Sequence, residues 1–228
     1  MEREEKLEAL VAELNKLDKE KLAIITGISA VLKFNTFEKT AKKIFETCKD
    51  IIGAYSGYVA LLSSDGHENE VLFLDSGGLS CNVDPQLPMP IRELRSDAYH
   101  QKRVVYDNNF NQSKWMEFIP QGHVILKNVL FSPLLVDGKA VGLIGLANKP
   151  GGFNDNDAEL ALIFGNLAAA ALRNSRMYEK LNESQQRFKS LIQAATSIII
   201  GVDSSCRIFE INKFGQDLLK IKQSRCYW

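Results

Sequence analysis

The chain has 228 residues, of which 45% are hydrophobic and 25% charged, which is typical of a globular protein with a buried core. Lysine plus arginine (28) balance aspartate plus glutamate (28), so no charge excess points to nucleic acid or an anionic membrane. The acidic start lacks an apolar leader, and no stretch reaches the roughly 20 apolar residues of a membrane span. The four cysteines lack zinc-binding spacing, so we expect a cytosolic protein with reduced thiols.

Residues 1–32 have the pattern of a long amphipathic helix. Apolar residues, Leu14 and Leu17 among them, recur at alternating three- and four-residue steps over about four heptads. The pattern fits either a helix packed on its own domain or a parallel two-stranded coiled coil. Lys21 occupies a seam position, where the edge of a coiled coil tolerates it better than a domain core does. We therefore favour a dimerisation helix.

The segment that follows predicts an α+β fold. A second helix is expected between Asn35 and Gly53, with Asn35 as N-cap and Glu38 completing a capping box. A β-β-α-β-β-β order comes next, with strands expected at 56–63, 70–75, 103–106, 128–136 and 139–147 and a short helix at 91–101. We expect an antiparallel β-sheet flanked by helices, with long coiled-coil-prone helices at the N- and C-terminal ends.

The stretch 139–160 predicts a buried strand, a glycine turn and a capped helix. Residues 139–147 are apolar and rich in strand-forming side chains, and residues 148–152 contain one proline and two consecutive glycines. Asn154 is a good N-cap, and Asp157 places a negative charge beside the free N–H groups of the first turn. The helix should begin at this point.

This stretch resembles the C-terminal signature of GAF domains. In that signature an aliphatic strand containing glycine is followed by Asn-Lys, here Asn148 and Lys149, and then by Phe-Thr-x-x-Asp at the start of the last helix. Phe153 matches, and Asn154 stands where threonine is usual, although both can cap a helix. The resemblance covers residues 22–176. It implies the GAF fold and a role in signalling proteins, either in sensing a small molecule or in dimerisation.

A candidate ligand-binding site comes from the long connection between the third and fourth strands. This connection carries Trp115, Met116 and Phe118, and a loop of this length is either functional or disordered. The bulky side chains argue against disorder. Together with His123 and Phe131, we expect them to line a partly apolar cavity, with His123 as its most polar group.

Two hypotheses remain open for His123. A similar His-to-Pro run occurs in haem-binding GAF domains of redox- and gas-sensing kinases, where the histidine is the proximal iron ligand, although Val124 here replaces a frequent proline. That resemblance implies that His123 could ligate haem and that Cys81 could form a thioether with a haem vinyl group. The alternative, which we favour, is a structural histidine beneath the connection. The cofactor is therefore unknown, with haem possible.

The helix after the GAF-like region predicts an oligomer. Apolar positions continue in one heptad register from Leu160 to Leu191. Packing on the sheet does not explain the apolar residues near its far end, and Asn174 would be a polar seam residue that fixes the register of a dimer. We predict a parallel homodimer through the two terminal helices, with interface residues Leu14, Leu17, Leu167, Asn174, Met177 and Leu181.

The last part of the chain resembles the opening of a PAS domain, in which two strands lead to an asparagine, here Asn212, and a leucine-rich helix. The tail from Ile221 to Trp228 matches no pattern. The expected division is an N-terminal dimerisation helix (1–32), a GAF domain (22–176), a signalling helix (172–192) and a partial PAS domain (190–228).

No catalytic motif is present: the sequence has no nucleophile elbow, P-loop, HExxH or histidine-kinase ATP-site boxes. We expect a sensory module of a two-component signalling protein, such as a sensor histidine kinase, that relays ligand binding through a dimeric helix to downstream PAS or kinase domains. A ligand-free dimerisation spacer and a haem-based redox or gas sensor are the alternatives. A methionine sulfoxide reductase ranks last, because Cys81 alone cannot support its redox cycle.

Overall fold

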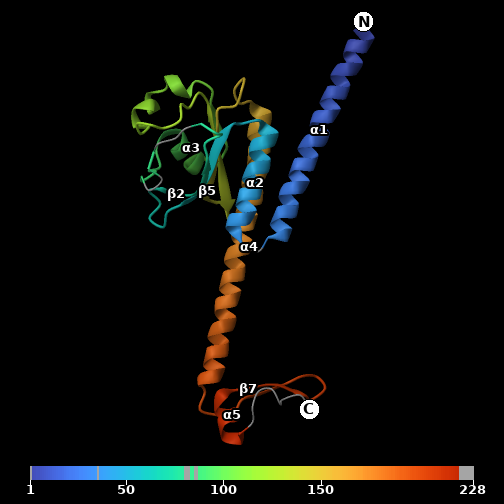
Figure 1. Cartoon of the computed structure of the whole chain (residues 1–228), viewed down its shortest axis with the longest axis vertical. Helices are drawn as coiled ribbons and strands as arrows, with labels where there is room; N and C mark the ends of the chain where they lie inside the picture. The colour runs from blue at the N-terminus through green and yellow to red at the C-terminus, as the bar shows by residue number, and fades with distance from the viewer. Residues whose placement is uncertain (1, 35, 80–82, 85–86, 221–228) are drawn as a thin grey trace. The chain divides into compact units, whose positions relative to one another are not determined.

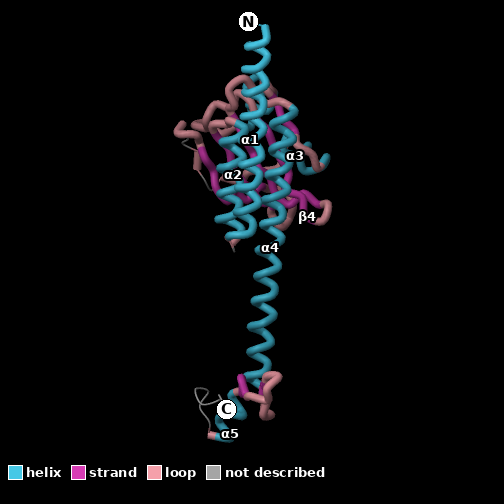
Figure 2. Tube along the Cα trace, turned by 90° about the vertical axis from the view of Figure 1, so that its right-hand side faces the viewer, coloured by secondary structure: helices cyan, strands magenta, loops and turns pink. Residues whose placement is uncertain are grey.

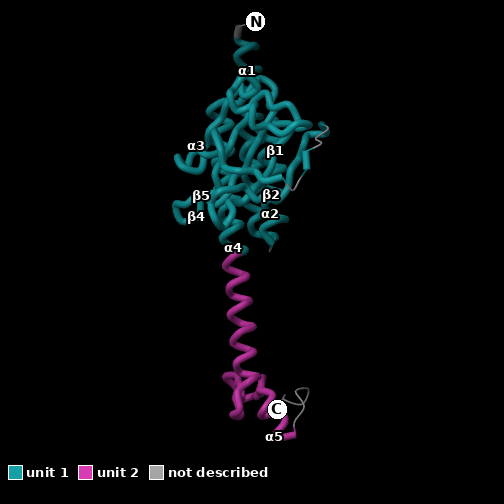
Figure 3. The backbone as a smooth tube through the Cα atoms, turned by 90° about the vertical axis from the view of Figure 1, so that its left-hand side faces the viewer, with its two compact units in different colours: residues 1–175 teal, residues 176–228 magenta. Residues whose placement is uncertain are grey.

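The computed structural model describes residues 2–34, 36–79, 83–84 and 87–220 (Figure 1). The chain divides into two compact units, residues 1–175 and residues 176–228 (Figure 3). The unmatched tail after residue 220 lies outside the described residues. In the part of the chain that is described, no helix is long and apolar enough to cross a membrane.

Unit 1 is built around an antiparallel sheet. Its strands are β1 (Ser56–Leu62), β2 (Asn69–Asp75), β3 (Val105–Asp107), β4 (Val129–Val136) and β5 (Lys139–Ala147). They lie in the order β2-β1-β5-β4-β3, and each neighbouring pair is antiparallel. A tight turn joins β4 to β5, and Asp137 and Gly138 both have positive φ in it, as a two-residue hairpin of this type requires.

α2 (Phe37–Ile52) and the first turns of α4 (Asp155–Ala194) cover one face of the sheet. α1 (Glu2–Lys33) packs against these helices on the side away from the sheet, as Figure 1 and Figure 2 show. α4 approaches β4 so closely that a Cβ on Gly165 would lie 2.6 Å from Ser132 Oγ, and that hydroxyl donates to the Ala161 carbonyl at 2.7 Å. The predicted α+β fold, with its flanking helices and long terminal helices, is confirmed.

The starts of α2 and α4 differ in how well they were predicted. α2 begins at Phe37 with the extended backbone of Thr36 as its N-cap, one position later than expected, and Asn35 lies outside the described residues. Phe37 is buried, so packing of this first helical residue fixes the start. In α4, Asn154 Oδ1 accepts from the backbone N–H of Asp157, and Asp157 Oδ2 accepts from the backbone N–H of Asn154. The predicted cap of α4 is confirmed.

The opposite face of the sheet carries a second core. Side chains alternate along β4, so Val129 and Phe131 pack on this face while Leu130 faces α2 and α4. The second face is covered by α3 (Glu93–Gln101) and two 3-10 segments, η1 (Phe110–Gln112) and η2 (Lys114–Phe118). These covering elements position the candidate site.

Unit 2 contains the last part of α4, the hairpin of β6 (Ile200–Val202) and β7 (Ile208–Ile211), and α5 (Lys213–Leu219). Asn212 is fully buried and caps α5. Its side-chain oxygen accepts from the backbone N–H groups of Ile199 and Gly215, and its amide donates to the carbonyls of Ile192 and Ser197. One asparagine thus joins the end of α4, the hairpin and α5.

Candidate functional site

The candidate site lies on the sheet face beneath α3 and η2 (Figure 1). Phe131 of β4 and Tyr99 of α3 are buried there, and Trp115 and Met116 of η2 are half-buried against the same cluster. The ring centroids of Tyr58 and Phe131 lie 6.4 Å apart. Large apolar side chains therefore cover this face on the β4 side.

Toward β1 and β2 the same face becomes polar. Tyr99 Oη donates to Asn69 Oδ1 at 2.6 Å, and the Asn69 residue is only 5% exposed. Three buried polar atoms on this face have no hydrogen-bond partner among the described residues: Tyr58 Oη, Asn69 Nδ2 and Glu93 Oε1. Buried polar groups in folded proteins are nearly always paired, so each of these atoms is free to accept a further partner. We call Tyr58, Asn69, Glu93, Arg95 and Tyr99 the polar cluster.

The Arg95 guanidinium is the positive charge of the polar cluster. Burial raises the pKa of Tyr58, Tyr99 and Glu93, and the nearby guanidinium opposes the rise in each case. Arg95 acts on the pKa of Tyr58, yet no group of the described residues reaches Tyr58 Oη with the geometry of a hydrogen bond. Arg95 and Tyr99 are four residues apart on α3, so their side chains leave the same face of that helix.

Glu93 has an unusual backbone. It is the first residue of α3, and its φ of 63° lies in the left-handed region. Residues other than glycine rarely adopt this conformation, and such strain concentrates at functional sites. The strained backbone and the unpaired carboxylate oxygen thus occur in the same residue.

The structure brings together some of the residues proposed from the sequence. Trp115, Met116 and Phe131 share the second core. Phe118 is 51% exposed, and the Arg92 guanidinium lies 5.2 Å from its ring centroid, so it contributes to the rim and not to the buried cluster. Its predicted role in lining a cavity stays a prediction.

His123 is half-buried, and its Nδ1 lies 2.7 Å from the Val124 carbonyl oxygen. A carbonyl can only accept, so Nδ1 donates, and in a neutral imidazole of this tautomer Nε2 carries the lone pair. This arrangement matches that of a metal-binding histidine held by a backbone carbonyl, so the imidazole fits the haem hypothesis. Cys81, the proposed thioether residue, lies outside the described residues. Haem ligation stays a prediction.

The polar cluster is not apparent from the sequence. Tyr58 and Asn69 lie on two strands, and the other three members lie on a helix far along the chain, so only the tertiary fold joins them. One local signal was available, because Arg95 and Tyr99 are four residues apart and must share one face of the predicted helix. Nothing in the sequence indicated that this face meets Tyr58.

A hollow lies on the surface at the end of α2. It has a volume of about 490 Å³ and is lined in part by Lys49, Tyr55 and Asp75. Lys49 forms an ion pair with Asp75, and this contact lowers the pKa of the Asp75 carboxyl. The hollow is open to solvent and its lysine is already paired with Asp75, so the polar cluster is the stronger candidate.

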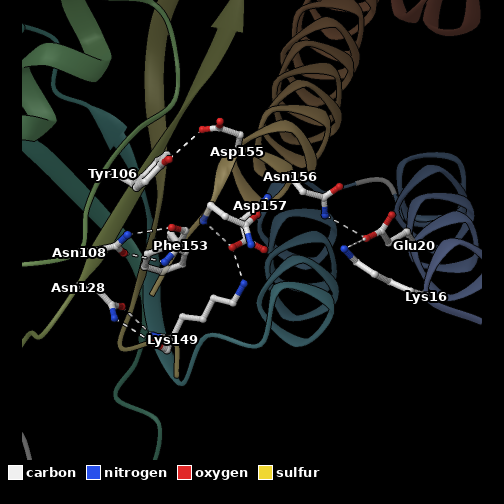
Figure 4. Close-up of polar contacts among 11 residues, drawn as sticks. Lys16, Glu20, Tyr106, Asn108, Asn128, Lys149, Phe153, Asp155, Asn156 and Asp157 are labelled. Atoms are coloured by element: carbon white, nitrogen blue, oxygen red, sulfur yellow. Dashed lines mark hydrogen bonds and ion pairs between the residues drawn. The ribbon is translucent and has the colours of Figure 1, made fainter. Parts of the chain in front are cut away.

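The signature residues lie in a polar network at the start of α4 (Figure 4). Lys149 Nζ forms an ion pair with Asp157 Oδ2, and the Asp157 side chain is 6% exposed. The Asn128 side chain forms two hydrogen bonds with the backbone of Lys149, and Asn108 forms two with the backbone of Phe153. The turn before α4 is therefore held from both sides.

The same network reaches β3 and α1. Tyr106 Oη donates to Asp155 Oδ1 at 2.8 Å, and Asn156 Nδ2 donates to Glu20 Oε1 at 3.1 Å (Figure 4). Tyr106 belongs to β3, whose residue Val105 pairs with Phe131 of the candidate site. Hydrogen bonds and strand pairing thus connect the candidate site, the first turn of α4 and α1.

Comparison with known proteins supports the same fold. A GAF domain from a Coxiella burnetii phosphoenolpyruvate-protein phosphotransferase is 12% identical and has a TM-score of 0.59, over 73% of this chain and 98% of that one. A free methionine-R-sulfoxide reductase from Neisseria meningitidis, solved with its substrate, is 14% identical with a TM-score of 0.56, over 70% and 91% of the two chains. At these identities the likeness concerns the fold alone.

One curated relative is similar in sequence over a shorter region. A probable 3',5'-cyclic phosphodiesterase, pde-5 of Caenorhabditis elegans, is 27% identical over 88 residues. The match spans 38% of this chain and 11% of the phosphodiesterase. Residues 35–173 match the family model described as "GAF domain". This match covers more than half of the chain, and the protein therefore belongs to the GAF domain family, whose members serve as regulatory and ligand-binding modules of signalling proteins.

Proposed function

We propose that the chain is a sensory module that binds a small polar molecule between α3 and the sheet. The observation that carries this proposal is the group of three buried, unpaired polar atoms on Tyr58, Asn69 and Glu93. Leaving a buried donor or acceptor unpaired costs about 1–3 kcal/mol per group. A bound molecule that pairs with them removes this cost, and Trp115 and Met116 supply an apolar cover.

The signal leaves the site through α4. Ligand contacts at the polar cluster bear on α3 and on the neighbouring sheet strands, and the hydrogen bonds of Asn108 and Tyr106 tie β3 and the turn after it to the first residues of α4. α4 then continues to Ala194. Ligand binding shifts the population between two packings of this helix, as in other switches built on packed helices.

The relay acts in a parallel homodimer. Apolar side chains are exposed on both long helices: Leu14 and Leu17 on α1, and Met177 and Leu181 on α4. A second copy of the chain would cover them along the heptad seam of each helix. Leu167 is half-buried and lies beside Gly27 of α1, so it supports the packing of α1 on α4 as well as the interface.

The receiver is a PAS domain of a larger protein of the sensor histidine kinase type. The support is local: the hairpin of β6 and β7 and the capping Asn212 repeat the order expected at the opening of such a domain. Ile200, Val202 and Phe209 are exposed in this unit, which fits a sheet that further strands would complete.

Native mass spectrometry of the purified full chain, together with a thermal-shift screen of a metabolite library, tests the sensory role. We expect a bound small molecule or at least one stabilising compound, and we expect Asn69→Leu to abolish the effect. Asn182→Leu, at an exposed position of α4, is the control and should retain it. Absence of any bound mass and of any stabilising compound would support the ligand-free spacer instead.

A further inference from the structure

The polar cluster also carries information about the class of ligand. We propose, as an extension of the sensory role above, that the site binds a small carboxylic acid with a hydrogen-bond donor beside its carboxylate, such as an α-amino or α-hydroxy acid. Arg95, Asn69 and Tyr58 recognise the carboxylate, and Glu93 recognises the neighbouring donor.

The anion-binding half of the site rests on Arg95. Its guanidinium is half-buried, and no carboxylate of the described residues forms an ion pair with it. Glu93 acts on it only at longer range. A guanidinium offers a planar fork of donors that matches a carboxylate, and such bidentate contacts are among the strongest hydrogen bonds in proteins. A partly desolvated arginine without a carboxylate partner is therefore suited to an acidic ligand.

Asn69 and Tyr58 add neutral donors on the same side. Asn69 Oδ1 already accepts from Tyr99, so the NH₂ group is the part of this side chain that remains available to a ligand. Asn69 is 5% exposed, so water outside the protein does not satisfy that group. The Tyr58 hydroxyl is also buried and unpaired. Both groups can donate to carboxylate oxygens.

Glu93, in contrast, requires a hydrogen-bond donor on the ligand. Its buried oxygen is an acceptor without a donor, and a ligand with only a carboxylate would bring a like charge toward it. A ligand ammonium or hydroxyl next to the carboxylate supplies the missing donor and separates the two negative groups. Binding an acid with an adjacent donor pairs all three unpaired atoms.

Two series of matched compounds test this class on the full chain by thermal shift and titration calorimetry. The first series is L-alanine, L-lactate, propionate and L-alaninamide. The second has a larger apolar side chain: L-leucine, 2-hydroxy-4-methylpentanoate, 4-methylpentanoate and L-leucinamide. We expect the amino or hydroxy acids to bind, and we expect compounds without the donor or without the carboxylate to bind at least about tenfold more weakly, as the loss of one charge-assisted contact predicts.

Single substitutions test the proposed ligand contacts of Arg95 and Glu93. Arg95→Gln should weaken binding of the acids by roughly tenfold or more, whereas Arg103→Gln, at an exposed position after α3, should leave it unchanged. Glu93→Gln keeps an acceptor but loses the charge, so it should weaken the amino acid more than the hydroxy acid.

Two results would overturn the proposed class: equal binding of the amides, and unchanged acid binding by Arg95→Gln. If neither series binds but another compound is released from wild type and not from Asn69→Leu, the class is wrong and the sensory role stands. If no compound binds at all, both the sensory role and the ligand class are wrong, and water molecules satisfy the polar cluster.

Discussion

Glu93 carries a carboxyl group whose ionised form is destabilised by burial. Burial raises the pKa of its carboxyl, and Arg95 and Arg92 offset this only in part. The folded state therefore holds the proton more tightly than the unfolded state does. Stability linked to this proton is complete below the ordinary carboxyl pKa of about 4.3 and is lost as pH rises through the folded-state pKa.

This linkage predicts the behaviour of Glu93→Gln. The variant should match wild type in stability near pH 4 and exceed it progressively toward neutral pH, because it removes a buried carboxylate while keeping an acceptor. Urea unfolding of both proteins at several pH values measures the difference. Asp97→Asn, at an exposed position of the same helix, is the control. A stability gain for Glu93→Gln that shrinks with rising pH would contradict the assignment.

Substitution of His123 distinguishes a haem-binding site from a structural histidine. If haem binds, Nε2 is the available ligand nitrogen, because Nδ1 donates to the Val124 carbonyl. We then expect wild type to give a shifted Soret band on haem titration and His123→Ala to lose it. A structural His123 predicts the other pattern: no haem binding by wild type and a lower melting temperature for the variant.

At the scale of elements, the start of α4 joins the signature residues to the rest of unit 1. Lys149 neutralises Asp157, whose side chain is nearly inaccessible. Removing one partner of a buried pair leaves an uncompensated charge, which costs about 3–5 kcal/mol. We therefore expect Lys149→Met to lower the free energy of unfolding by about that amount in urea.

A double variant shows whether the isolated charge causes this loss. Lys149→Met combined with Asp157→Asn removes both charges, and asparagine can still accept from the backbone N–H of Asn154. We expect it to recover more than half of the lost stability. A double variant no more stable than Lys149→Met would mean that lost packing around the lysine stem dominates.

The same element shows what the sequence could predict. The cap of α4 depends on Asn154 and Asp157, which are three residues apart, so its chemistry is visible in the sequence. The sheet was predictable for the same reason, because alternating runs and turn residues are local signals. The start of α2 was misplaced by one position, since the burial of Phe37, a tertiary effect, decides it. The polar cluster could not be predicted from the sequence, because the contacts between β1, β2 and α3 are formed only in the tertiary fold.

At the scale of the whole molecule, the question is what covers the apolar seams of the long helices. Met177 and Leu181 are 60% and 56% exposed in the single chain, and exposed apolar residues in heptad register favour pairing with another helix. Asn174 is exposed on the same helix. In a coiled coil, a buried asparagine at such a position lowers stability but fixes the register.

The last prediction concerns this seam. Sedimentation of the full chain at tens of micromolar should show a dimer, and Asn174→Leu should tighten association, because a leucine seam residue buries more apolar surface. The register should loosen at the same time, so a Met177→Cys variant that crosslinks across a symmetric parallel seam should crosslink less efficiently when Asn174→Leu is added. Asn182→Leu, off the seam of the same helix, should change neither quantity. A monomer at this concentration would exclude the dimeric relay, because the seam around Met177 and Leu181 would then lack the second copy against which its packing is proposed to change.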